Sequence, residues 1–341
     1  MRRSLRFAIF LVITVALVWA LLTQVRIADI ASAMASVGPW WLLASFVLYL
    51  LSTTLRATRF VLFLKGRIGL GRMLRIVYTH NLANNALPSF LGELSFVYLA
   101  RDTQKVSTGE ATAALIVSRL FDLGAVFGLT ALALFFVPNA PSQFRLLLMA
   151  FGAALLLIFI AIVLVVVFKH RALGIVDKTL MLLRLRGIRV VDWGFSKLQE
   201  TIEALESMHG LRTYVLGIGV SLAVWLLAYA QTYVLLVAMG YDISFMTAAL
   251  GTSLYRIAST LPVYGVLGFG TVELSWAVAF VLLGMQKDAA IVSGFAVHII
   301  TLSYAVLLGV IATMMHGAKI DTTETRIEKQ AETPVEKEKP R

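Results

Sequence analysis

Apolar segments long enough to cross a bilayer recur along this chain, and they constrain its fold more than any other feature. A transmembrane helix needs about 17–25 mainly apolar residues. Runs of this kind occupy 7–23, 39–55, 110–137, 144–168, 213–239 and 289–315. The chain is 59% hydrophobic with a mean hydropathy of +0.86, which exceeds the apolar share of soluble domains. We therefore predict an all-α polytopic membrane protein with about six full transmembrane helices.

Two further apolar segments are interrupted by residues that suit a lipid-spanning helix poorly. They contain LPSFLGELS at 87–95 and LPVYGVLGFGTVELS at 261–275. Proline and glycine weaken or break helices, so we expect helix breaks around Pro88, Gly92, Pro262, Gly268 and Gly270. The two Glu-Leu-Ser copies indicate two related halves of the chain. Paired broken segments are the sequence feature that best locates the binding site of a secondary transporter.

The distribution of positive charge predicts how these segments insert. Lys and Arg concentrate in cytoplasmic loops, so we place there the connector 169–212, both termini and the basic stretch with Arg56, Arg59, Lys65, Arg67, Arg72 and Arg75. Segment 71–102 is flanked by positive charge on both sides, so it is expected to be a re-entrant hairpin from the cytoplasm. Segment 246–283 is then expected to be a re-entrant hairpin from the outside, which makes an inverted repeat.

An alternative treats each broken segment as a full span, which gives eight crossings and a parallel relation between the halves. Either way, residues 1–316 form a single transmembrane domain. The tail at 317–341 alternates Lys and Glu and is expected to be disordered. The basic N-terminus and the apolar run 7–23 are also typical of a signal peptide. We favour an uncleaved first span because the Ala31-Ser32-Ala33 sequence lies far beyond that run.

Charged and titratable residues inside the apolar segments are the candidate binding residues. A charge at the bilayer centre costs about 2.5–3.5 kcal/mol on insertion scales, so such residues face protein, water or ligand. The candidates are Glu93, Arg119, Asp122, Arg256, Glu273 and His298. Asn85, beside Asn84, is added because it lies next to the first break, where it would satisfy backbone groups or contact a ligand.

Spacing predicts partners for several of these residues. Arg119 and Asp122 are three positions apart, so they share a helix face and would form a self-neutralising pair. Alternatively, Arg119 reaches Glu93 or a substrate phosphate, which its planar guanidinium binds well. Arg119 follows Glu93 by 26 positions, and His298 follows Glu273 by 25. Each glutamate therefore has a candidate cationic partner in the span after its hairpin.

The two glutamates have two interpretations that can coexist. Each lies near the start of the second helix of its hairpin, where the positive helix end favours a carboxylate. Each would therefore cap exposed backbone amides, bind substrate or carry a proton. His298 is either a packing residue or a proton-coupling group, because histidine titrates near neutral pH.

Several function classes are disfavoured by the sequence. The net charge of +11 is explained by cytoplasmic loops, and no separate basic domain points to nucleic acid. The chain contains no cysteine, no P-loop, no His-Glu-x-x-His and no Gly-x-Ser-x-Gly motif. We therefore expect no metal, no cofactor and no enzymatic activity. An intramembrane transferase that uses Glu93 as its base is the least favoured alternative.

The motifs together resemble a known family. The chain is similar to the lysylphosphatidylglycerol synthase transmembrane-region family in three motifs. They are Asn85-x-Leu87-Pro88-x-x-x-Gly92-Glu93, then Ser118-Arg119-x-x-Asp122, and then Leu261-Pro262 with the glycines before Glu273. Its members are also called flippase-like domain proteins. The second motif departs from the family pattern, because His298 stands where an arginine is expected and Gly265-Val266 replaces a glycine-richer run.

The resemblance implies a stand-alone lipid flippase in the cytoplasmic membrane, without the soluble synthase domain of two-domain relatives. Its cargo would be a phospholipid, glycolipid or polyprenyl-linked lipid with an anionic or glycosylated headgroup. The headgroup would lie near Glu93, Arg119 and Glu273, with Arg256 as a further phosphate ligand. The alternative is a non-transporting membrane partner of a glycosyltransferase or another lipid-modifying enzyme, which would dock on the cytoplasmic connector.

Overall fold

The described part of the protein is built from helices alone. A computed structural model describes residues 14–86, 89–103, 105–137, 169–183, 211–258 and 266–315, together with 146, 150, 153, 157, 191–192, 195–196 and 199–203. Its main elements are α2 (Ile27–Ser36), α3 (Pro39–Phe63), α4 (Leu70–Ala86), α5 (Ser89–Asp102), α6 (Thr108–Phe136), α8 (Lys169–Leu182), α10 (Leu211–Ala238), α11 (Phe245–Ala258), η1 (Val266–Gly268), α12 (Thr271–Leu282) and α13 (Lys287–Met314). The all-α polytopic fold predicted from the sequence is confirmed.

Four of the described helices are long and apolar enough to cross a membrane: α3, α6, α10 and α13. They correspond to four of the six predicted spans. Within the first predicted span, Thr14–Leu22 is helical and then bends by 82° into α2, while residues 1–13 lie outside the described residues. Most of the predicted span 144–168 and the whole predicted tail 317–341 also lie outside them.

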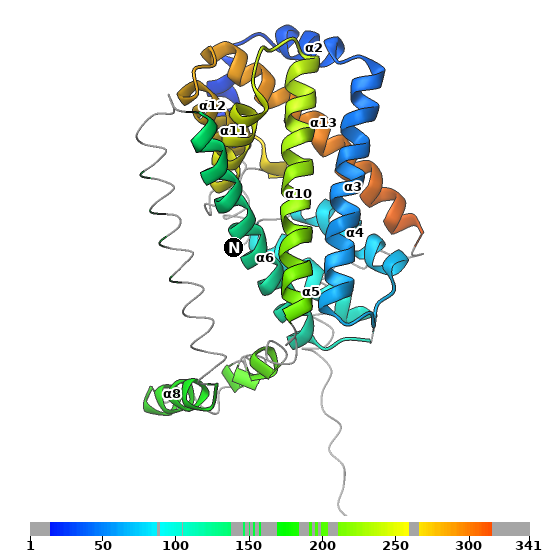
Figure 1. Ribbon diagram of the computed structural model, residues 1–341, viewed down its shortest axis with the longest axis vertical. Helices are drawn as coiled ribbons and strands as arrows, with labels where there is room; N and C mark the ends of the chain where they lie inside the picture. Colours follow the sequence, from blue (N-terminus) through cyan, green and yellow to red (C-terminus); the bar gives the residue numbers. More distant parts are fainter. Residues whose placement is uncertain are drawn as a thin grey trace, which may run out of the picture.

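Both interrupted segments consist of two short helices. The first contains α4 and α5, with 17 and 14 residues. The second contains α11 and α12, with 14 and 12 residues. The helices α5, α11 and α12 are shorter than the 17–25 residues that span a bilayer, and α4, at the lower limit of that range, is not among the helices apolar enough to cross it. In Figure 1 the first pair lies in the lower half of the bundle and the second pair in the upper half. This arrangement is what insertion from opposite faces requires, although insertion itself stays a prediction.

The apolar core has two main parts, one around each hairpin. The first cluster draws its buried residues from 57–117, which covers α3 to α6. The second joins residues of the N-terminal segment and α2 to residues 235–300 of the second half. The long helices α10 and α3 pack against each other and join the two halves (Figure 1). In addition, α4 packs against both α13 and η1. The first hairpin therefore touches the break of the second hairpin.

Two glycines allow these breaks and close contacts. Gly92 lies in α5 where a Cβ would be 2.7 Å from the Cα of Asn84, so only glycine lets α4 and α5 approach this closely. Gly270 has a φ of 85°, a left-handed conformation that other residues rarely adopt, directly before α12. Gly268 also has a positive φ of 80°. The other two predicted break residues, Pro88 and Pro262, lie outside the described residues.

The second span is longer than the sequence indicated. We expected it to end near Leu55 and to be followed by a cytoplasmic basic stretch, but α3 continues to Phe63. Arg56 and Arg59 therefore lie inside a membrane-length helix. The apolar residues that follow them, Phe60 to Leu64, continue the helix and pack into the first core cluster. The predicted end of this span near Leu55 was therefore wrong, and Arg59 is buried within the bundle, where it pairs with Asp122.

Substituting Gly92 with alanine should destabilise the protein. The added Cβ would force α5 away from Asn84, and overpacking of this kind costs about 1–3 kcal/mol. We expect a lower thermal unfolding midpoint for the detergent-purified variant. Gly124→Ala is the matched control, because a Cβ there meets nothing within 4 Å on α6. Equal midpoints for wild type and Gly92→Ala would contradict the close approach of α4 and α5.

Candidate functional site

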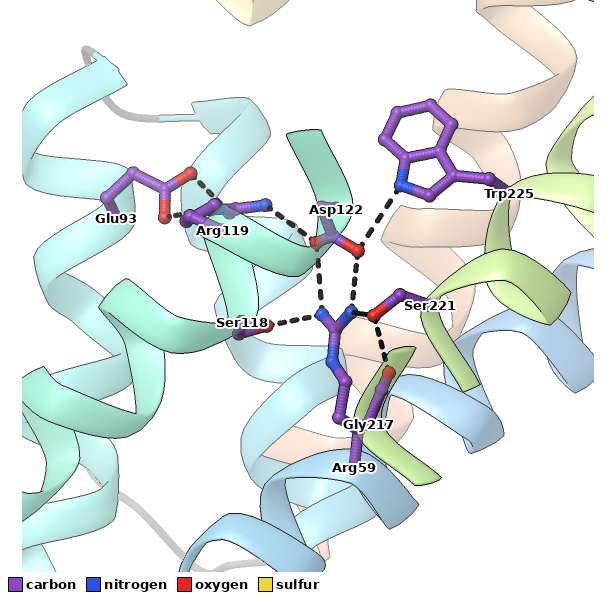
Figure 2. A network of polar contacts seen from close by, with 8 residues as sticks. All are labelled: Arg59, Glu93, Ser118, Arg119, Asp122, Gly217, Ser221 and Trp225. Atoms are coloured by element: carbon purple, nitrogen blue, oxygen red, sulfur yellow. Dashed lines mark hydrogen bonds and ion pairs between the residues drawn. The ribbon is translucent and has the colours of Figure 1, made fainter. Parts of the chain in front are cut away.

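A buried ion pair lies at the centre of the bundle. Arg59 on α3 is 1% exposed, and its guanidinium donates to both carboxylate oxygens of Asp122 on α6, at 2.6 and 3.0 Å. Such a two-pronged contact is the strongest geometry available to a carboxylate and an arginine. Figure 2 shows this pair in the middle of a wider polar network. The pair fixes α3 against α6 inside the membrane-length part of both helices.

The same network extends to the third long helix. The Arg59 guanidinium also donates to the hydroxyls of Ser118 on α6 and Ser221 on α10. Ser221 in turn donates to the carbonyl of Gly217, at 2.9 Å, and Trp225 donates its indole N–H to Asp122, at 3.2 Å (Figure 2). Three spans that are far apart in sequence are therefore held by one charged group and its partners.

Arg119 pairs with Glu93, as the 26-residue spacing predicted. Its Nε donates to Glu93 Oε2 at 3.0 Å, and its Nη2 donates to the other carboxylate oxygen. Arg119 also approaches Asp122, with 3.7 Å between Nη1 and Oδ2. The alternative in which Arg119 and Asp122 mainly neutralise each other does not describe this geometry, since Asp122 has shorter contacts with Arg59. The Glu93–Arg119 pair joins α5 of the first hairpin to α6 (Figure 2).

The second hairpin has an equivalent pair, as the 25-residue spacing predicted. His298 Nδ1 lies 2.6 Å from Oε1 of Glu273, whose side chain is fully buried. The other oxygen, Oε2, accepts the backbone N–H of Gly270 at 2.7 Å, so Glu273 also caps the start of α12. The pair joins α12 of the second hairpin to α13. In both halves a carboxylate therefore links the second helix of the hairpin to the following span.

A polar cavity of about 160 Å³ lies where the two halves meet. It is bordered by α3, α4, α10, α11, α12 and α13. Its charged and polar lining residues are Tyr49, Ser52, Thr53, Arg56, Asn81, Asn84, Asn85, Gln231, Tyr255, Arg256, His298 and Thr301. No Asp or Glu lines this cavity in the part of the chain that the structure describes. Its lining therefore offers donors and positive charge rather than carboxylates.

The predicted candidates divide into two groups. Arg256, His298 and Asn85 line the cavity. Glu93, Arg119, Asp122 and Glu273 do not line it, and each is engaged in an ion pair or hydrogen bond with protein. Asn85 also donates its amide to the carbonyl of Asn81, at 2.7 Å, one turn earlier in α4. The structure thus separates paired carboxylates from a cationic cavity, two features that the sequence had merged into one site.

Three residues of this region were missed from the sequence. Arg56 and Arg59 were assigned to a cytoplasmic loop, and Gln231 was not considered. The apolar run from Phe60 to Leu64 was the available signal, because it extends the helix past both arginines. Nothing in the sequence pointed to Gln231, which lies in a long apolar helix and donates weakly to Thr301, at 3.4 Å. Among the described residues no cluster of His, Asp and Glu could hold a metal ion.

Removing one partner of the buried Arg59–Asp122 pair should be strongly destabilising. Arg59→Gln or Asp122→Asn leaves the other charge buried without compensation, which costs about 3–5 kcal/mol. The exposed pair Arg67–Glu110 is the matched control, and Arg67→Gln should cost less than about 1 kcal/mol. Chemical denaturation of the purified variants measures both values. Similar costs for the two pairs would contradict a central role of Arg59.

Comparison with known proteins places the chain in a family. The family described as lysylphosphatidylglycerol synthase TM region matches residues 6–309. A comparison with curated proteins found no match. The matched range includes α3 to α6, α10 to α12 and most of α13, and therefore both hairpins, both carboxylate pairs and the whole cavity lining. This multi-pass membrane chain belongs to the lysylphosphatidylglycerol synthase TM region family.

Proposed function

We propose that this protein translocates a lipid across the cytoplasmic membrane, with both termini on the cytoplasmic side. The observation that carries the proposal is the polar cavity at the meeting point of two hairpins of short helices. Polar and cationic groups at membrane depth are costly, so they persist where they serve a ligand or an ion. A cavity between paired broken helices is the arrangement that secondary transporters use for substrate.

In this proposal the headgroup binds in the cavity while its hydrocarbon chains stay in the bilayer. Arg256 binds the headgroup directly, and the two carboxylate pairs act as latches. Glu93–Arg119 holds α5 against α6, and Glu273–His298 holds α12 against α13. Opening either hairpin toward its own side of the membrane breaks the corresponding pair. Alternate opening of the two latches then gives the headgroup access to one face at a time.

Proton transfer is the proposed means of releasing the latches. Protonation of Glu93 would weaken its contact with Arg119 because a neutral carboxyl no longer attracts the guanidinium. In the second latch the imidazole Nδ1 of His298 contacts Glu273 Oε1 directly, so the ring is placed to exchange a proton with that carboxylate. A proton that moves between the carboxylates and His298 would therefore couple hairpin movement to the proton gradient.

The other candidate function is a non-transporting partner of a glycosyltransferase or another lipid-modifying enzyme. The cytoplasmic connector would supply the docking surface, and part of it already packs against the bundle, where the Gly109 backbone donates to Glu200 at 3.1 Å. Flipping by the purified protein alone would exclude this as its whole function. Product formation from candidate lipids by the purified protein would instead support the intramembrane transferase with Glu93 as base.

Breaking the first latch should abolish flipping without unfolding the protein. We expect Glu93→Gln and Arg119→Ala to reduce the movement of fluorescent lipids in reconstituted vesicles to the background rate. Both residues are partly exposed, at 31% and 39% of their side chains, so the loss of stability should be smaller than for the buried Arg59–Asp122 pair. The charge-swapped double variant Glu93→Arg/Arg119→Glu should recover part of the activity because it restores the pair.

Arg67→Gln is the matched control, since it removes an arginine from another Arg–Glu pair, outside the hairpins. Its flipping rate should equal that of the wild type. Wild-type flipping by both Glu93→Gln and Arg119→Ala would overturn the assignment of this pair to the transport cycle.

A further inference from the structure

The balance of charge around the cavity indicates what kind of headgroup it accepts. Three acidic residues surround the cavity without lining it, and each has its own cationic partner: Asp122 with Arg59, Glu93 with Arg119, and Glu273 with His298. Two arginines that do line it, Arg56 and Arg256, have no carboxylate within ion-pair distance among the described residues. The cavity lining therefore carries two guanidinium groups that form no ion pair with a described carboxylate.

Arg56 has the clearest need for a ligand. It lies on α3 one turn before Arg59, and the Nε atoms of both arginines are buried without a hydrogen-bond partner. Arg59 has Asp122 as its ion-pair partner, whereas Arg56 has no ion pair with a described carboxylate. A buried polar atom without a partner costs about 1–3 kcal/mol, and an unpaired charge in a membrane costs more. Arg256 reaches the same cavity from the last turn of α11, where its guanidinium carbon lies 5.0 Å from the centre of the Tyr255 ring. The two guanidiniums thus come from different halves of the protein.

The chemistry of the lining fits a terminal phosphate. A phosphate monoester carries a charge of about −1.5 to −2 near neutral pH and has three strong acceptor oxygens, which balances the two arginines. Donors are available from Arg56, Arg256, Asn81, Asn84 and Gln231. One water needs about 10–15 Å³ on this measure, so the volume of about 160 Å³ leaves room for a phosphate group of five heavy atoms.

Headgroups that carry an ammonium group fit this cavity poorly. An ammonium would need a carboxylate or an aromatic cage as its partner. The described lining contains no Asp or Glu, and of its aromatic residues Tyr49, Tyr255 and Trp276, the Tyr255 ring already faces the guanidinium of Arg256. A zwitterionic or aminoacylated headgroup would also place positive charge beside two unpaired arginines. A phosphodiester with a neutral substituent would leave one of the two positive charges uncompensated.

We propose that this cavity binds the terminal phosphate of a lipid phosphomonoester, held between Arg56 and Arg256, in preference to phosphodiester, zwitterionic or aminoacylated headgroups. The proposal specifies the substrate class of the transport function proposed above and rests on it. Binding can nevertheless be measured without transport, so the two proposals fail separately.

The test measures equilibrium binding to the detergent-purified full chain at pH 8, where a phosphomonoester is doubly charged. The probes are dioctanoyl phosphatidic acid, dioctanoyl phosphatidylglycerol, dioctanoyl phosphatidylcholine and inorganic phosphate. We expect phosphatidic acid to bind at least about tenfold more tightly than the other two lipids. Inorganic phosphate should compete only weakly with phosphatidic acid. If the two bound with equal affinity, the inference that the bound phosphate belongs to a lipid would be overturned.

Two variants connect this preference to the cavity. Arg56→Gln and Arg256→Gln should each weaken binding of phosphatidic acid by about ten- to a hundredfold, the usual effect of losing a charge-assisted contact, and should change phosphatidylglycerol binding little. Arg26→Gln is the matched control, because Arg26 is exposed and pairs only locally with Asp29. If Arg56→Gln does not fold, Arg256→Gln carries the test, since its side chain is exposed.

Equal affinity for the three lipids, or an unchanged preference in Arg256→Gln, would overturn the inference while leaving transport of some other lipid intact. Selective binding without any flipping in vesicles would instead support the phosphate site and overturn the proposed transport function.

Discussion

The structure depends on the need to pair the charges that it buries at the centre of the bundle. Arg59 and Asp122 satisfy this need at the centre of the bundle, and α10 joins them through Ser221, which accepts from Arg59, and Trp225, which donates to Asp122. Lipid supplies no hydrophobic drive for helices to associate, so packing and interhelical hydrogen bonds must hold them together. The three spans α3, α6 and α10 therefore form a frame. The first hairpin packs against it in the lower half of the bundle and the second in the upper half (Figure 1).

The carboxylate pairs of the hairpins differ from this central pair in exposure and in position. Glu93–Arg119 is partly exposed and Glu273–His298 is buried, yet each joins the second helix of a hairpin to the next span. The cavity between the hairpins contains the cations that have no such partner. This division between a fixed frame, two releasable pairs and a cationic cavity is the physical basis for the proposed transport of an anionic lipid.

Much of this arrangement could be predicted from the sequence, and particular residues explain what could not. Local patterns identified the long helices and the hairpin helices, because apolar length and Pro/Gly breaks are properties of short segments. The spacing between Glu93 and Arg119, and between Glu273 and His298, identified both pairs. The sequence places Arg59 in a loop because the positive-inside rule assigns an arginine near the end of an apolar segment to a loop. In the structure Arg59 is buried because its charge is paired with Asp122. Only the tertiary structure shows that Arg56 and Gln231 line the cavity, because it is the packing of α3, α10 and α11 that brings them together.

The most direct test of this account is an experimental structure of the protein in a lipid bilayer disc, purified with its native lipids, at a resolution that resolves headgroups. The account predicts a lipid phosphate within hydrogen-bond distance of the guanidiniums of Arg56 and Arg256, with the acyl or isoprenoid chains leaving the cavity toward the bilayer. A cavity empty of lipid in which Arg56 and Arg256 pair with carboxylates of the protein itself would contradict it.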